Sequence, residues 1–195
     1  MEYVRCDAGR EKMPPVEDLG GQLLISAPTL WDPNFRRTVV LVGAHDDDGA
    51  VGVVLNRVTE LAVVDAAPPL ADLVPGGEPL FVGGPVRPEG AVVLADLEHP
   101  ERVEVVAFAS IGFLPEVVDR AALGRIRRAR VFAGHTGWGP GQLEAEIEEG
   151  SWLLEPAIPD DVFHPDPGRL WEDVLQRKGK GFEILRLMPG DPSTN

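Results

Sequence analysis

The chain has 195 residues, 44% of them hydrophobic, which is enough for one sizeable core but short for a second independent domain. Its 32 acidic residues against 18 basic ones leave a formal net charge of −14. Such a charge repels the phosphate backbone that supplies most nucleic-acid affinity. The composition therefore argues against DNA or an anionic membrane surface as the default partner.

The first residues and the cysteine usage bear on the compartment. Residues 1–19 are charged, contain Pro14 and Pro15 and lack a continuous apolar stretch, so they predict a flexible tail and not a signal peptide. The single cysteine, Cys6, cannot form an intramolecular disulfide. No later stretch approaches the roughly 18 apolar residues that a membrane span requires. We expect a soluble, cytoplasmic protein.

One domain is predicted over residues 20–188, followed by a tail at 189–195. Its first element is a strand in GQLLISA. In WDPNF, Asp32 is placed to cap one helical turn that starts at Pro33. The segment 38–56 then sets two β-branched apolar runs around a turn rich in Asp and Gly. This pattern is typical of a hairpin whose strands are buried on both faces.

The middle of the chain is less regular. Residues 57–80 are interrupted by prolines and glycines and support at most a short helix at 70–74. Residues 80–97 predict two strands around a Gly-Pro turn, and residues 102–109 predict another strand. A surface excursion therefore separates the hairpin from the next strands.

A brief helix is expected to open on Pro115. After it, IRRARVFA alternates apolar and basic residues as far as a glycine-rich corner. This alternation predicts a strand at a solvated edge of the sheet, with Arg127, Arg128 and Arg130 in solvent.

The corner, within VFAGHTGWGPGQLEAEIEEG, precedes an acidic helix predicted at residues 142–149 and closed by Gly150. Because it follows a strand and opens a helix, its backbone N–H groups could hold a phosphate. Its spacing fits neither the Walker nor the dinucleotide pattern, however, and the acidic helix repels anions. The favoured interpretation is a tight corner in which Trp138 is buried, Pro140 takes the first helical position and Gln142 reaches back as a cap.

The C-terminal part adds a strand at 151–155, a helix in GRLWEDVLQRK that ends at Gly179, and a final strand in FEILRLM, residues 182–188. Strands outnumber helices, and the regular strand–helix alternation of a doubly wound sheet is missing. The predicted fold class is α+β, with a mixed, partly barrel-like sheet flanked by a few helices.

The sequence offers two catalytic alternatives. FASIG around Ser110 differs by one residue from the G-x-S-x-G nucleophile elbow and is followed by Asp119 and His135 in the order of a hydrolase triad. Phe108, however, replaces the first glycine of the elbow. His135 alone is also a possible general base. A hydrolase using Ser110 and His135 stays as the alternative hypothesis.

Metal and nucleic-acid sites are not expected. The acidic turn HDDDG fails the calcium-loop register, because Ala44 and Leu55 would take the two anchoring positions. The four histidines show no zinc spacing, and no cofactor is predicted. The one basic cluster could serve a nucleic-acid-binding regulator, which we regard as the less favoured hypothesis; its arginines are Arg125, Arg127, Arg128 and Arg130.

Four segments, in the same order, resemble the AlgH/YqgE family of bacterial proteins. They are DPNFRRTVVLVGAHDDDGAVGVVLNR, FVGGPV, AGHTGWGPGQLEAEIEEGSWLL and DVFHPDPGRLWEDVL. The most specific motifs are D-x-x-F-R-R at 32–37, G-x-V-L-N-R at 52–57 and G-W-x-x-G-Q-L-E at 137–144.

The resemblance implies a compact α/β protein with a sheet partly curled into a barrel, in a family without a settled biochemical activity. One branch carries the name of a transcriptional regulator of alginate synthesis. Many members have Tyr where this chain has His135 and His where it has Ala95. A site that relies on that Tyr or His is therefore in question here.

Polar side chains of these motifs define a predicted ligand pocket. If the fold brings the motifs together, their donor and acceptor groups would suit a small ligand; equally, they could tie strands to helices. The candidate residues are Arg36, Arg37, Asn56, Arg57, His135, Trp138, Gln142 and Glu146. The favoured hypothesis is a non-catalytic protein that binds a small ligand or a protein partner.

Overall fold

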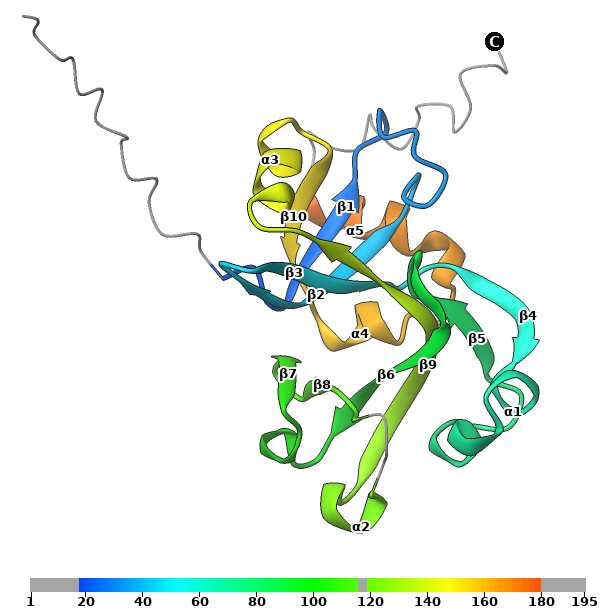
Figure 1. Cartoon of the computed structure of the whole chain (residues 1–195). Helices are drawn as coiled ribbons and strands as arrows, with labels where there is room; N and C mark the ends of the chain where they lie inside the picture. The colour runs from blue at the N-terminus through cyan, green and yellow to red at the C-terminus, as the bar shows by residue number, and fades with distance from the viewer. Residues whose placement is uncertain (1–17, 116–118, 180–195) are drawn as a thin grey trace, which may run out of the picture.

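A computed structural model of the chain describes residues 18–115 and 119–179 (Figure 1). Ten strands form the sheet within these residues. In chain order they are β1 (Gln22–Ser26), β2 (Val39–Asp46), β3 (Gly49–Val54), β4 (Val58–Ala62), β5 (Pro79–Val82), β6 (Val86–Leu97), β7 (Val105–Phe108), β8 (Ile111–Phe113), β9 (Ile126–Trp138) and β10 (Trp152–Pro156).

The helices are short. In chain order they are α1 (Val63–Ala66), η1 (Pro68–Leu73), η2 (Pro100–Arg102), α2 (Arg120–Leu123), α3 (Gln142–Glu148), α4 (Pro159–Val162), η3 (Pro167–Arg169) and α5 (Leu170–Lys178), where η marks a 3-10 helix. No helix in the described part of the chain is long and apolar enough to cross a membrane.

Strand β9 joins the two halves of the sheet. The strand order is β10-β1-β2-β3-β9-β6-β8-β7, and β5 adds to β9 in parallel with β4 outside it. The end of β9 pairs with β3, from Thr136 to Trp138, and its longer first part pairs with β6. Figure 1 shows β9 running from α2 at one end of the molecule to α3 at the other. The fold is α+β, as predicted.

The sheet curls without closing. Strand β7 packs against β2 across the curl. Among the described residues, however, β7 pairs with β8 alone and β10 with β1 alone. The partly barrel-like sheet implied by the family resemblance is therefore an open, curled sheet and not a closed barrel.

The hairpin β2–β3 is buried on both faces, as its β-branched runs predicted. One face, with Leu41 and Val53, packs against Trp171 and Val174 of α5 in the main core. The other face forms a second core with the end of β9 and with α3; its buried residues are Leu24, Val40, Val42, Ala50, Val54, Trp138, Leu143 and Trp152. Helix α5 ends before Gly179, as expected.

The prediction that the arginine-rich strand lies at a sheet edge was wrong. Strand β9 is central, and Arg130 is only 8% exposed. Its guanidinium lies 4.6 Å from the centre of the Phe81 ring and donates to the carbonyls of Val162 and His164, both at 2.8 Å. A cation can be buried here because backbone carbonyls and an aromatic face replace its water.

Asp96 binds Arg127 and Arg128, the other two arginines of this strand that were predicted to lie in solvent. Its carboxylate accepts hydrogen bonds from Ser110 at 2.8 Å, Arg127 at 2.8 Å and Arg128 at 3.2 Å. Burial alone would raise the pKa of Asp96, but these three donors outweigh it, so the pKa lies below its ordinary value. Much of the basic cluster is therefore occupied by internal contacts.

Several predicted boundaries differ from the observed ones. Helix α2 begins at Arg120, where the Asp119 carboxylate accepts from two backbone N–H groups, and not at Pro115. Helix α3 begins at Gln142 after Gly141, which adopts a left-handed conformation with φ +71°, so Pro140 lies before the helix. Strands β4 and β8 and helix α1 were not predicted. The strand predicted at 182–188 lies outside the described residues.

A large bulge in β6 shapes the middle of the sheet. Val86 pairs with His135 and Ala91 pairs with Ala133, so residues 87–90 loop out opposite the single residue Gly134. Gly134 has φ +69°, and a Cβ there would lie 2.5 Å from the Gly84 carbonyl oxygen. Only glycine fits between the two backbones at this point.

We expect Gly134→Ala to destabilise the fold by about 2 kcal/mol or more, because it adds a backbone clash to the roughly 1 kcal/mol cost of a left-handed alanine. Gly77→Ala is the matched control, since Gly77 has φ +84° but no atom within 4 Å of its Cβ position. Urea denaturation of the two variants measures the difference. Equal losses would show that the close approach contributes nothing.

Candidate functional site

The loop at residues 32–37 is the meeting point of most of the predicted site residues. The Asn56 side chain accepts from the Val39 N–H at 3.0 Å and donates to the Arg37 carbonyl at 2.9 Å. Arg57 donates to the Pro33 carbonyl at 2.6 Å. The expected single turn is present, with Asp32 accepting from the Asn34 N–H at 2.7 Å. These polar groups hold backbone in place through hydrogen bonds within the protein.

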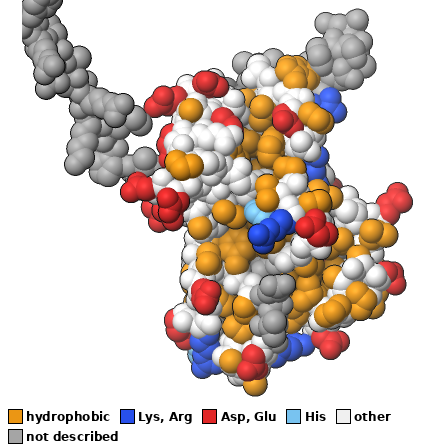
Figure 2. Space-filling view, viewed as in Figure 1, with side chains coloured by type: hydrophobic (Ala, Val, Ile, Leu, Met, Phe, Trp, Pro, Cys, Tyr) orange, Lys and Arg blue, Asp and Glu red, His pale blue; other side chains and the backbone are white. Residues whose placement is uncertain are grey.

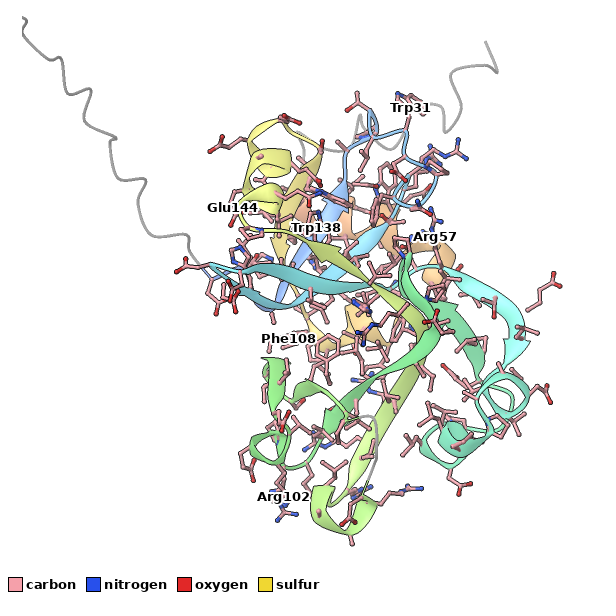
Figure 3. All side chains as sticks on the ribbon, in the orientation of Figure 1. Trp31, Arg57, Arg102, Phe108, Trp138 and Glu144 are labelled. Carbon is pink, nitrogen blue, oxygen red and sulfur yellow. The ribbon has the colours of Figure 1, made fainter. Side chains whose placement is uncertain are left out.

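The three arginines beside this loop differ in environment. Arg37 has φ +53°, and its guanidinium lies 5.2 Å from the centre of the Trp171 ring. Burial and the nearby Arg36 lower the pKa of Arg57, while Asp32 opposes the shift. Arg36 is exposed. Figure 3 shows Arg57 at the base of this loop and the exposed Trp31 at its tip.

The glycine-rich corner is organised around Glu146. Its carboxylate accepts from the indole N–H groups of Trp138, at 3.0 Å, and Trp152, at 2.8 Å, and from the Gln142 amide at 2.9 Å. Phe35 of the 32–37 loop stacks on the Trp138 indole, with ring centres 6.3 Å apart, and makes an edge-to-face contact with the Trp152 indole, with ring centres 5.5 Å apart. The Gln142 side chain also accepts from the Gly139 N–H at 3.1 Å, as a reaching-back cap does. The corner is therefore a packed structural junction.

We expect Glu146→Ala to cost roughly 1–3 kcal/mol of unfolding free energy, because it leaves two largely buried indole N–H groups without an acceptor. Glu148→Ala removes an exposed carboxylate from the same helix and should stay within about 0.5 kcal/mol of the parent. Urea denaturation followed by tryptophan fluorescence reports both. Similar values for the two variants would contradict the junction.

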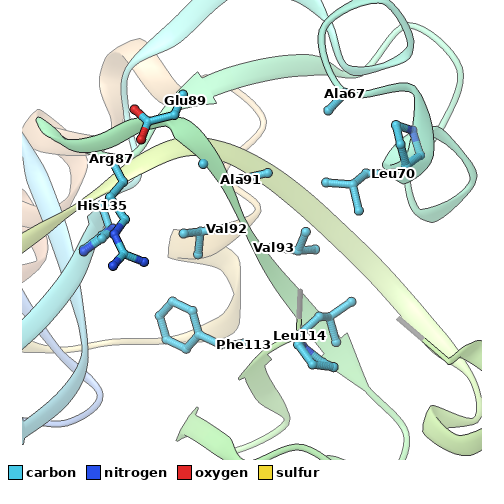
Figure 4. Close-up of a pocket in the computed structure, with 13 residues that line it drawn as sticks. Ala67, Leu70, Arg87, Glu89, Ala91, Val92, Val93, Phe113, Leu114 and His135 are labelled. Carbon is cyan, nitrogen blue, oxygen red and sulfur yellow. The ribbon is translucent and has the colours of Figure 1, made fainter. Parts of the chain in front are cut away.

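His135 differs from the other predicted residues because it lines a cavity. The cavity has a volume of about 590 Å³ and lies beside the bulge of β6. Its walls come from η1, β6, β8 and β9, and we call it the Arg87 cleft (Figure 4). Its lining residues are Ala67, Pro69, Leu70, Arg87, Glu89, Gly90, Ala91, Val92, Val93, Phe113, Leu114, Pro115 and His135.

The polar groups of the Arg87 cleft gather at one end. Figure 4 shows the Arg87 and His135 side chains close together, with Val92 and Phe113 beside them and Glu89 turned away. Arg87 adopts φ +48°, a left-handed conformation that is rare for a non-glycine residue. Among the described residues, none forms a hydrogen bond or ion pair with its exposed guanidinium. Strained residues of this kind cluster at functional sites.

The electrostatics of this end favour a neutral imidazole. Burial lowers the pKa of His135, and the positive charge of Arg87 lowers it further. Near neutral pH, His135 therefore offers one N–H donor and one nitrogen acceptor next to a permanent cation. Such a pair can recognise an anionic or polar group that enters the cleft.

The lowered pKa of His135 predicts a pH dependence of stability. The folded state favours the neutral ring, so its contribution is present above the ordinary pKa of about 6.5 and is lost as the pH falls below it. We expect unfolding free energy to drop less between pH 7.5 and pH 5.5 in His135→Gln than in the parent. Arg87→Gln should give an intermediate drop, because only burial then remains. An unchanged drop in His135→Gln would contradict the environment described.

The hydrolase arrangement is not assembled. Ser110 donates to Asp96, and the Asp119 carboxylate caps α2 through the N–H groups of Ala121 and Ala122. Among the described residues, His135 hydrogen-bonds to neither Ser110 nor Asp119. The acidic turn at residues 46–48 and the other described His, Asp and Glu residues form no group able to hold a metal ion.

Arg87 was missed at the sequence level. Its segment, RPEG, follows the predicted Gly-Pro turn and contains a proline and a glycine, so it is typical of an ordinary turn region. The pairing of β6 with β9 on both sides of the segment turns it into a bulge. No local signal in the sequence indicates that partner strand.

These features define the class of protein: an α+β domain with an open, curled sheet and a cleft at a bulge in the middle of the sheet. The AlgH-like family model matches residues 23–183. The chain belongs to this family.

Relatives and solved structures agree with that assignment. A UPF0301 protein of Streptomyces avermitilis is 40% identical, over 94% of this chain and 98% of its own length, and one of Mycobacterium tuberculosis is 37% identical over 90% of each. A crystal structure of a Corynebacterium diphtheriae protein superposes with TM-score 0.79 at 28% identity, covering 89% of this chain and 94% of that one. The solution structure of AlgH from Pseudomonas aeruginosa gives 0.68 at 27% identity, covering 92% and 99%.

Proposed function

We propose that this protein acts by binding a small ligand in the Arg87 cleft, without catalysing a reaction. The observation that carries the proposal is the guanidinium of Arg87, which has no partner among the described residues and is held in a left-handed conformation beside His135 in a cavity with mostly apolar lining residues. A concave, mostly apolar site with a few converging polar groups is the usual form of a small-molecule site. The cavity volume of about 590 Å³ lies in the range of such sites.

The proposal moves the ligand site away from most of the residues expected from sequence. Four of those residues form hydrogen bonds with other groups of the protein; they are Asn56, Arg57, Gln142 and Glu146. Of the predicted residues, His135 alone lines the Arg87 cleft. A non-catalytic role is supported because Ser110, the one proposed nucleophile, is hydrogen-bonded to Asp96 and not to a histidine.

Titration of the ¹⁵N-labelled full chain with benzoate, benzyl alcohol and benzylammonium tests for occupancy irrespective of ligand charge. We expect at least one probe to give saturable shifts of the backbone resonances at residues 87–93, 113–114 and 135. Ala91→Trp, which fills the cleft from an exposed strand position, should abolish them. Val51→Trp is the control, because Val51 is a strand residue 46% exposed and outside the cleft lining.

Two results would count against the proposal. If the resonance shifts were confined to the 32–37 loop, the ligand site would lie around Arg36, as predicted from the sequence, and not in the Arg87 cleft. The absence of saturable shifts at the cleft with all three probes would remove ligand binding there.

A further inference from the structure

The Arg87 cleft has one cationic end, and apart from His135 and Glu89 its other lining side chains are apolar. Beyond Arg87 and His135, the wall consists mainly of Leu70, Val92, Val93, Phe113 and Leu114. In the space-filling view of Figure 2, a basic side chain and a histidine lie next to each other above a hydrophobic area, with an acidic side chain beside them. A ligand that satisfies both parts needs a charged head and an apolar body.

Arg87 is a cation without a hydrogen-bond or ion-pair partner among the described residues of an acidic chain. Acidic residues outnumber basic ones by 32 to 18, and the buried or partly buried arginines pair with carboxylates or carbonyls. Glu89 shares the bulge with Arg87, yet no ion pair joins the two side chains in the described structure. Arg87 therefore keeps its donors available for a group from outside.

The number of donors indicates the kind of anion. One guanidinium can hold the two oxygens of a carboxylate in a bidentate arrangement, and the neutral imidazole of His135 can supply one further donor. A phosphate dianion is better served by several cations or by backbone N–H groups at a helix end. Arg87 is the only Lys or Arg among the described residues that line the cleft, and Glu89 is also part of that lining. The chain as a whole carries a formal net charge of −14.

Building on the proposed function, we propose that the ligand of the Arg87 cleft is a carboxylate with an apolar body. The carboxylate is held by Arg87 and His135. The apolar body lies against Val92, Val93 and Phe113, which form the wall next to this end.

The test uses four probes with the same six-carbon chain: hexanoate, hexanol, hexylammonium and hexyl phosphate. Affinities are measured by titrating the ¹⁵N-labelled full chain at pH 7.5 and following the cleft resonances. We expect hexanoate to bind at least about tenfold tighter than hexanol, since a charge-assisted hydrogen bond is worth roughly that factor or more. Hexylammonium should bind weakest, because Arg87 repels it.

Variants at position 87 assign the effect to the guanidinium. Arg87→Gln should lower hexanoate affinity at least about tenfold while leaving hexanol affinity within about twofold. Arg87→Lys keeps the charge but loses the bidentate geometry, so an intermediate affinity is expected. Arg36→Gln is the matched control, because Arg36 is exposed and lies outside the cleft lining.

The outcomes separate the ligand class from the proposed function. Equal binding of hexanoate and hexanol in the cleft, unaffected by Arg87→Gln, would overturn the carboxylate but leave a ligand-binding cleft. Hexyl phosphate binding more than tenfold tighter than hexanoate would replace the carboxylate by a phosphoryl group. Cleft resonances that respond to none of the four probes, nor to the benzyl probes, would remove both proposals.

Discussion

The rest of the structure depends on the close approach of two backbones, at Gly83 and Gly84 after β5 and at Gly134 and His135 in β9. The Gly83 N–H donates to the Ala133 carbonyl at 2.8 Å, and a Cβ on Gly83 or Gly84 would collide with the carbonyl oxygen of Gly134 or His135. With this approach, β9 pairs with three strands, β3, β5 and β6. Opposite Gly134, β6 loops out at residues 87–90, and Arg87, Glu89 and Gly90 of this bulge line the cleft.

The arginines of β9 and the arginine of the β6 bulge differ in their surroundings. Arg127, Arg128 and Arg130 project from the central strand. Arg127 and Arg128 form ion pairs with Asp96, and Arg130 pairs with Glu78 and donates to backbone carbonyls. Arg87 projects from the bulge, where the β6 backbone leaves the ladder. Much of a basic cluster that suggests a polyanion surface is thus engaged by partners within the protein. Arg87, in a short turn-like segment, has no hydrogen-bond or ion-pair partner among the described residues.

Local patterns were sufficient to predict those elements whose burial follows from their own residues. The β2–β3 hairpin and the apolar face of α5 are examples, because β-branched runs and helical spacing encode them directly. Features set by distant partners were not predictable in this way. The central place of β9, the bulge at Arg87 and the role of Glu146 between two indoles each depend on strands far away in sequence.

The pairing of β1 with β10 has a consequence for how the chain folds. Leu23 of β1 lies opposite Glu155 of β10. The edge of β1 that pairs with β10 therefore stays unpaired until β10 has been synthesised. Until that part of the chain leaves the ribosome, Leu24 and Ile25 present an apolar strand with an open edge. Such an edge is a site for mispairing, and it is covered only after the β10 residues have been synthesised.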